Sequence, residues 1–429
     1  MMKYLFSFVI LLFFSITVFS QKSEVKQFDS NELGTTRVLK IHIPKSYKKD
    51  GDRVYPLTIV LDSEYLFDVY VANAKLFSNK DKAPEQIIVG VAQNQNQEKE
   101  RYADCAYDKI TSMPTAKSTQ FYRFIRNEVL NYMEDNYRIS PFKTIVGNTL
   151  TANFTNYFLL EKDPAFQAYI NLNPSYALDI REMLQVKIPQ IENSTYYYII
   201  SGNYNSKSKK IVDDIDALLK TSENEMFNYR YDEINGSTKV ASIGQGIASS
   251  LAFIFDQYSA ISKEEYKRNI AHLAPPDAIE YLEKKYVEIE YLFGANIKIR
   301  ERDIYAIEGI IIDKEEGDYL QEFGKMINRL YPESPIGDYY IGKYFEMGKV
   351  YKKALKYYKN GFSKIADDDP NKDGYYQNVE RVLELRRKSR EPEPEEDEET
   401  NPEDNEDNPD KKENEETPNE DNPNDNKKD

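Results

Sequence analysis

The chain has 429 residues, of which 40% are hydrophobic and 13% aromatic, which is enough for two folded domains and a tail. Its net charge of -16 is concentrated at the C-terminus, where residues 391–429 contain 19 acidic and 4 lysine side chains. The rest of the chain is therefore close to neutral. Because it has no basic stripe, nucleic-acid binding is not expected.

Residues 1–20 are predicted to be a secretory signal peptide. Lys3 supplies the charged start, the apolar run extends from Tyr4 to Phe19, and Ser20 precedes the expected cut at Gln21. The run is shorter than the roughly 20 residues that span a bilayer, so cleavage is favoured over the alternative of a membrane anchor. We therefore expect an exported protein, periplasmic, in the cell envelope or secreted, whose membrane contact is limited to the signal peptide.

Cys105 is the only cysteine, so an internal disulfide is excluded. The flanking sequence, residues 102–107, contains no histidine or basic residue that would lower the pKa of a thiol. A buried, inert thiol is therefore favoured over a nucleophile.

Residues 21–260 alternate between strand and helix patterns, which predicts an α/β domain. Strands are predicted at Thr35–Ile43, Pro56–Leu61, Ile87–Val91, Thr144–Val146, Phe166–Leu172, Tyr196–Ile200 and Phe227–Tyr231. Helices are predicted at Ser118–Arg138, Leu150–Leu160, Ile211–Leu219 and Gly246–Tyr258. Continuous apolar runs are typical of strands covered on both faces, so we expect a mostly parallel sheet with helices on both faces.

Residues 261–388 show helical patterns only. Gly309 and Gly342 lie 33 residues apart, and each is expected to let two helices approach closely. The positions that fit the tetratricopeptide (TPR) consensus are Gly342, Phe345, Ala354 and Tyr358. Two such units are too few to stand alone, so we expect them to dock on the sheet domain or on helices within Ala274–Leu292. A generic helical bundle is the alternative.

Residues 389–429 are predicted to be a disordered acidic tail. Beyond Arg390 there is no hydrophobic residue, so the segment cannot bury enough surface to offset the entropy of ordering.

Residues 147–151, Gly-Asn-Thr-Leu-Thr, form the most informative motif. They lie between an apolar run and a helical pattern, which is the strand–turn–helix layout of a nucleophile elbow with the usual form G-x-S-x-G. Thr149 stands at the serine position and Thr151 at that of the last glycine. Because a β-branched residue tolerates a positive φ poorly, we expect the turn to have relaxed.

Several further segments occur in an order that resembles the putative esterase family of α/β-hydrolases, which is related to S-formylglutathione hydrolase and enterochelin esterase. These segments are Ile43–Tyr47, Tyr55–Asp62, Ile88–Val91, Asn127–Leu130, Gly147, Asp163–Phe166 and Asn173–Ser175. Many such proteins continue into TPR units. The resemblance implies a serine nucleophile, a histidine base, an orienting carboxylate and an oxyanion-binding backbone N–H, here that of Leu150.

The residues at the matched positions do not fit these catalytic roles. The histidine position falls near Lys239, and the carboxylate position falls in Ser201–Asn205, which contains no acid. Of the two histidines, His42 lies in an early strand, where a place on the sheet face is expected, and His272 lies in the connection to the helical domain. A Thr149–Lys239 dyad, or His272 as a base that folds back, stays open.

The sequence therefore predicts an exported esterase-like protein that has lost catalysis and acts as a binding or scaffolding module. A protein partner is expected at the TPR-like domain or in the vacated cleft. The alternative is a carboxylic-ester hydrolase with an atypical nucleophile, Thr149. We expect no metal and no cofactor, because the sequence has neither a His/Cys cluster nor a nucleotide-binding glycine motif.

Overall fold

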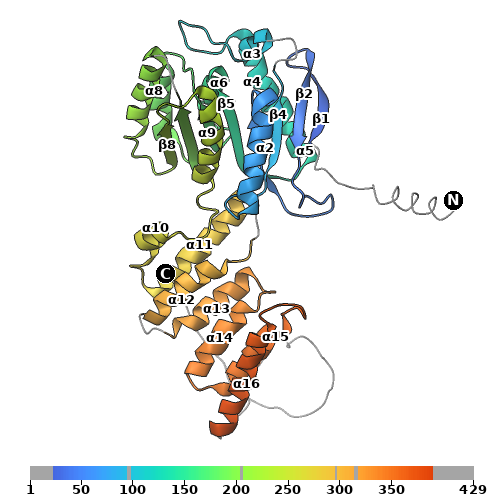
Figure 1. Cartoon of the computed structure of the whole chain (residues 1–429), viewed down its shortest axis with the longest axis vertical. Coiled ribbons are helices and arrows are strands. Elements are labelled where there is room, and N and C mark those ends of the chain that lie inside the picture. Colours follow the sequence, from blue (N-terminus) through green and yellow to red (C-terminus); the bar gives the residue numbers. More distant parts are fainter. Residues whose placement is uncertain (1–22, 94–97, 203–205, 295–296, 314–316, 390–429) are drawn as a thin grey trace, which may run out of the picture.

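A computed structural model describes residues 23–93, 98–202, 206–294, 297–313 and 317–389. The predicted signal peptide, residues 1–20, and the acidic tail beyond Arg390 lie outside the described residues. Figure 1 shows a sheet domain above and a helical region below, joined by the long helix α11 (Pro275–Phe293).

Within the described residues, one eight-stranded sheet has the order β1-β2-β4-β3-β5-β6-β7-β8. Its strands are β1 (Glu24–Ser30), β2 (Thr35–His42), β3 (Tyr55–Val60), β4 (Ile87–Val91), β5 (Ile139–Asn148), β6 (Ala168–Leu172), β7 (Thr195–Ser201) and β8 (Phe227–Glu233). β2 pairs antiparallel with both of its neighbours, whereas the pairs from β4 to β8 are parallel. The predicted mostly parallel sheet is thus confirmed.

Helices cover both faces of this sheet (Figure 1). One face carries α4 (Ala116–Arg123), a π-helical turn (Phe124–Val129), α5 (Leu130–Asn136), α6 (Leu150–Leu159), α7 (Ile180–Lys187) and α8 (Ser206–Leu219). The other carries α2 (Ser63–Asn79), α9 (Lys239–Ile254) and the C-terminal end of α11. The strands alternate between the two cores, with Leu57 and Ile59 of β3 facing the first core and Val60 the second.

The helical region follows the sheet without further strands among the described residues. Its elements are α10 (Lys263–Glu265), a π-helical turn (Tyr266–Ile270), α11, α12 (Glu301–Asp313), α13 (Tyr319–Leu330), α14 (Ile336–Met347), α15 (Tyr351–Ser363) and α16 (Lys372–Ser389). Helix α11 serves both parts, because Phe293 packs in the sheet core and Leu282 in the helical core. The prediction that the helices after residue 300 pack on helices within Ala274–Leu292 is confirmed.

The two glycines expected at helix contacts behave differently. A Cβ on Gly342 of α14 would lie 2.7 Å from the ring of Tyr358, so this glycine is needed for close packing against α15. A Cβ on Gly309 would meet nothing within 4 Å, so the prediction for that position is wrong. The close approach between α13 and α14 occurs instead at Gly324, where a Cβ would lie 2.5 Å from the carbonyl oxygen of Gly337.

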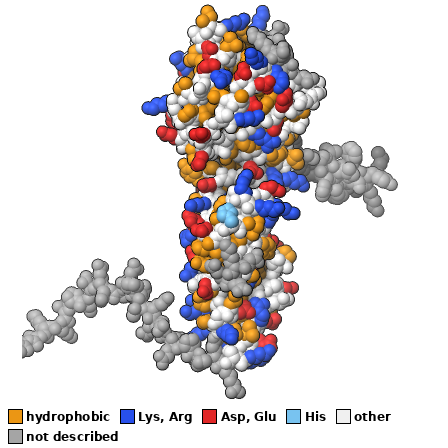
Figure 2. Space-filling model, turned by 90° about the vertical axis from the view of Figure 1, so that its left-hand side faces the viewer, with side chains coloured by type: hydrophobic (Ala, Val, Ile, Leu, Met, Phe, Trp, Pro, Cys, Tyr) orange, Lys and Arg blue, Asp and Glu red, His pale blue; other side chains and the backbone are white. Residues whose placement is uncertain are grey.

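The surface is that of a nearly neutral protein. Figure 2 shows acidic and basic side chains interspersed over the face in view, without a field of one sign. Among the helices that the structure describes, none combines the length and the apolar character needed to cross a bilayer.

Candidate functional site

The elbow keeps the backbone of a nucleophile turn. Strand β5 ends at Asn148, α6 begins at Leu150, and Thr149 between them has φ 56° and ψ -106°. The expectation that the turn had relaxed is therefore wrong. Such a conformation costs a β-branched residue on the order of 1–3 kcal/mol. Gly147 makes the sharp turn possible, because a Cβ there would lie 2.5 Å from the backbone of Thr151.

Backbone hydrogen bonds on both sides hold Thr149 in this conformation. Its N–H donates to the carbonyl oxygen of Leu172 at 2.9 Å, and its own carbonyl accepts from the N–H of Ser175 at 3.0 Å. Both partners belong to the end of β6 and the loop that follows it. These main-chain hydrogen bonds do not depend on a glycine or serine at position 149. They offset the backbone strain, which was expected from the sequence to prevent this conformation.

Thr151 is tolerated at the position of the last glycine in the G-x-S-x-G motif because its hydroxyl both accepts and donates a hydrogen bond. Oγ1 accepts a hydrogen bond from the backbone N–H of Asn148 at 2.6 Å and donates to Oδ2 of Asp62 at 2.7 Å. The side chain is completely buried. A buried hydroxyl with both kinds of partner carries little penalty, so the second threonine is accommodated.

Asp62 is a fully buried carboxylate beside the elbow. It follows β3, precedes α2 and has φ 53°. Its backbone N–H donates to Oε1 of Gln93 at 3.0 Å, and Gln93 in turn donates through Nε2 to the sulfur of Cys105 at 3.4 Å. A buried carboxylate is stable only when it is paired and hydrogen-bonded, and the cation that pairs it is Arg101.

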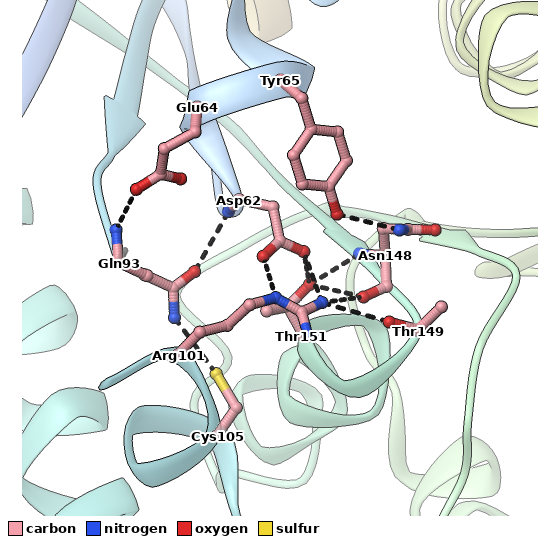
Figure 3. Close-up of polar contacts among 9 residues, drawn as sticks. All are labelled: Asp62, Glu64, Tyr65, Gln93, Arg101, Cys105, Asn148, Thr149 and Thr151. Atoms are coloured by element: carbon pink, nitrogen blue, oxygen red, sulfur yellow. Dashed lines mark hydrogen bonds and ion pairs between the residues drawn. The ribbon is translucent and has the colours of Figure 1, made fainter. Parts of the chain in front are cut away.

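Arg101 of α3 (Glu98–Cys105) reaches across the elbow (Figure 3). Nε and Nη2 bind the two carboxylate oxygens of Asp62, with Nη2 at 2.9 Å from Oδ2. Nη2 also donates to the carbonyl oxygen of Asn148 at 3.0 Å and to Oγ1 of Thr149 at 3.1 Å. Burial acts to lower the pKa of Arg101, but the Asp62 carboxylate outweighs it and holds the pKa above its usual value.

Arg101 was not among the residues that sequence reasoning singled out. It lies 39 residues after Asp62 and 48 before Thr149, on a short helix with no apolar periodicity. The single usable signal was Asp62 itself, an acid at the end of an apolar strand that needs a cation once it is buried.

Tyr65 extends the same network on the α2 side. Asn148 Nδ2 donates to the Tyr65 hydroxyl at 2.9 Å, and burial, together with the Asp62 carboxylate, raises the pKa of Tyr65 to about 12. The phenol therefore stays protonated at neutral pH and does not act as a base.

Lys239, at the expected histidine position, is the first residue of α9 and is exposed. Its carbonyl oxygen accepts from Asn173 Nδ2 at 3.2 Å, and Asn173 Oδ1 accepts from the N–H of Gly202 at 2.9 Å and from Ser242 Oγ at 3.0 Å. Asn173 thereby ties the ends of β6 and β7 to α9. Residues 203–205 of the expected carboxylate segment lie outside the described part of the chain.

The two histidines are remote from the elbow. His42 ends β2 and is buried, as expected for a residue on the sheet. His272 is exposed and lies just before α11, whose opposite end packs through Phe293 against Phe142 near the start of β5. Figure 1 shows the helical region leaving the sheet at the end opposite to α3. Because β5 alone separates Phe142 from Thr149 by roughly 20 Å, His272 does not reach the hydroxyl.

Cys105 is completely buried, which confirms the expected burial of this thiol. Burial, reinforced by the neighbouring Asp104, raises its pKa well above the usual value. Across the described residues, no group of three or more His, Cys, Asp or Glu side chains is placed to hold a metal ion.

The sequence of residues 30–168 matches the family model described as putative esterase. This stretch includes the turn at Thr149, the buried Asp62 and Arg101. Comparison with curated protein sequences gives no match.

Solved structures with the same fold extend the likeness. An uncharacterised protein from Capnocytophaga ochracea DSM 7271 is 23% identical, with a TM-score of 0.74 over 85% of this chain and 100% of that chain. An IroE-like serine hydrolase from Shewanella oneidensis is 18% identical, with a TM-score of 0.53 over 72% of this chain and 98% of that chain. At these identities the likeness shows the fold. The first match also takes in part of the helical region, since it exceeds the length of the esterase-like domain.

Proposed function

We propose that this chain is an exported, non-catalytic relative of the esterases whose elbow is structural and whose role is binding or scaffolding in the cell envelope. The observation that supports loss of catalysis most directly is the hydrogen bond from Arg101 Nη2 to Oγ1 of Thr149. A hydroxyl nucleophile needs a neighbour that accepts its proton. A guanidinium has five donors and no acceptor, so it cannot do so.

The other candidate bases are poorly placed for the task. His272 lies beyond the far end of the sheet. Lys239 is exposed at the start of α9, and its carbonyl oxygen accepts the hydrogen bond from Asn173. Removing one member of such a triad lowers the reaction rate by several orders of magnitude.

A residual hydrolase that uses Thr149 is the second candidate, and one observation favours it. The strained φ of 56° is retained although the residue is β-branched, and strain of this kind concentrates at active sites. The N–H of Leu150, at the start of α6, would then be the oxyanion donor.

Turnover of short-chain p-nitrophenyl esters by the full-length protein separates the two candidates. We expect no rate above that of the Thr149→Ala variant, and no gain in Arg101→Met, because neither protein has a base. A wild-type rate that disappears in Thr149→Ala would reject the non-catalytic proposal. Unfolding curves of all three proteins show whether each is folded during the assay.

We place the binding role in the helical region, because at the elbow the Thr149 hydroxyl is already hydrogen-bonded to Arg101. A groove of about 660 Å³ is formed there by α12, α14 and α16. Its aromatic lining consists of Tyr305, Tyr331, Tyr339, Tyr340 and Tyr375. Glu308 is already paired with Lys343 at 2.6 Å, but the carboxylates of Glu301 and Asp369 still outnumber the ammonium of Lys298. This excess favours a partner segment with apolar and basic side chains.

Co-purification from envelope extracts tests this assignment. Tyr305 in the groove is 60% exposed and Tyr291 outside it is 70% exposed, so their alanine variants form a matched pair. A partner retained by wild type and Tyr291→Ala but lost by Tyr305→Ala supports the groove. Equal retention by both variants contradicts it.

A further inference from the structure

A second cavity, of about 330 Å³, lies at the opposite end of the sheet domain from the elbow. It is enclosed by the end of β2, the C-terminal turn of α2 and the residues that lead into β4. Figure 1 shows the lower, C-terminal end of α2 at the end of the sheet domain that lies away from α3. Its volume is at the small end of the range typical of small-molecule sites.

The ionic side chains around this cavity carry a positive excess. Lys45 and Lys75 line it, and neither forms an ion pair with any residue that the structure describes. The one carboxylate in the lining, Glu85, already accepts a hydrogen bond from Ser46 Oγ and pairs with Arg53 at 3.3 Å. The cavity thus has two cations without counterions.

Two buried polar side chains in the lining also lack partners. Gln86 is 3% exposed; its Oε1 accepts from Thr58 and Tyr70, whereas its Nε2 has no acceptor among the described residues. The His42 imidazole is likewise 3% exposed and is not hydrogen-bonded within the described chain, but its ring nitrogens are not among the fully buried unpartnered atoms. A buried donor without an acceptor costs about 1–3 kcal/mol, so Gln86 Nε2 calls for an explanation.

From this arrangement we infer that the cavity lined by His42, Lys75 and Gln86 binds a small tetrahedral oxyanion, phosphate or sulfate, free or as a monoester. The ammonium groups supply charge, and the imidazole and amide supply directed N–H donors, which is the complement of an oxyanion. The inference is independent of whether Thr149 is catalytic.

The electrostatics of His42 fit the same site. Burial, with the nearby Lys75 ammonium, lowers the pKa of His42 to about 4. An anion in the cavity would face both groups and favour the charged imidazole, so its arrival must raise that pKa.

Calorimetric titration of the full-length protein with inorganic phosphate at low ionic strength tests the inference. We expect saturable binding at one site, weakened about tenfold or more in Lys75→Met, because a charge-assisted hydrogen bond is lost. Lys80→Met is the matched control, since Lys80 is exposed, belongs to the turn after α2 and lies outside the cavity lining. Sulfate and glycerol 3-phosphate, titrated alongside, show whether free anion or monoester binds more tightly.

The histidine ring provides a readout that a purely structural change would not give. In NMR titrations of the wild type, phosphate should raise the midpoint of His42 ionisation. The inference is overturned if no saturable binding occurs below about 10 mM phosphate. It is also overturned if Lys75→Met and Lys80→Met weaken binding equally, or if binding leaves the His42 titration unchanged.

Discussion

Replacing Arg101 with methionine removes the one guanidinium that pairs with the buried Asp62. Leaving a buried carboxylate without its cation typically costs 3–5 kcal/mol. Asp62 keeps the hydrogen bond from Thr151, and the Arg101 side chain is 21% exposed, so we expect the low end of that range, about 3 kcal/mol. The loss arises from the stranded carboxylate, because methionine preserves most of the side-chain volume.

Urea unfolding of the full-length protein, followed by circular dichroism, measures this loss. The Asp62→Asn/Arg101→Met double variant should recover much of it, giving a coupling energy of about 2 kcal/mol. Arg230→Met is the control, because Arg230 and Asp232 form a pair at 3.0 Å with the arginine 45% exposed. Such surface pairs contribute at most about 1 kcal/mol. A cost below that for Arg101→Met, or no recovery in the double variant, would refute the argument.

Three further predictions follow from single residues. The His42 pKa is lowered to about 4 in the folded protein, so stability is full above the unfolded pKa near 6.5 and falls by up to about 3 kcal/mol as the pH drops to 4. In urea titrations across this pH window, the difference in unfolding free energy between wild type and His42→Gln should change by that amount. Gly342→Ala drives a methyl group into the Tyr358 ring and should cost about 1–3 kcal/mol, whereas Gly309→Ala should be neutral or stabilise by up to about 1 kcal/mol; equal thermal shifts would contradict the packing described. The raised pKa and burial of Cys105 predict no reaction with thiol reagents at pH 8 until urea unfolds the protein, and rapid native-state labelling would be inconsistent with that burial.

Much of the sheet could be predicted because its strands are continuous apolar runs. The bounds of β4 agree with the sequence prediction, and β3 and β7 differ by one residue at their ends. Strand β1 was not predicted, because it is an edge strand whose side chains are largely exposed and polar. Helix α2 was also not predicted, although it covers the second face of the sheet.

The candidate site was predictable in position but not in content. The motif at residues 147–151 located the elbow, since a strand–turn–helix layout is local in sequence. The state of its backbone was not predictable, because the hydrogen bonds that hold Thr149 come from Leu172 and Ser175 on another strand and loop. Arg101 reaches the Thr149 hydroxyl from a helix that is distant in sequence, and no local sequence pattern predicts such a contact.

The most direct test of the central claim is the reactivity of the Thr149 hydroxyl itself. The native full-length protein is treated with a fluorophosphonate probe, and its intact mass is measured beside that of Thr149→Ala. A hydroxyl that faces a guanidinium rather than a base should give no adduct in either protein. A single stoichiometric adduct on the wild type that is absent from Thr149→Ala would contradict the account.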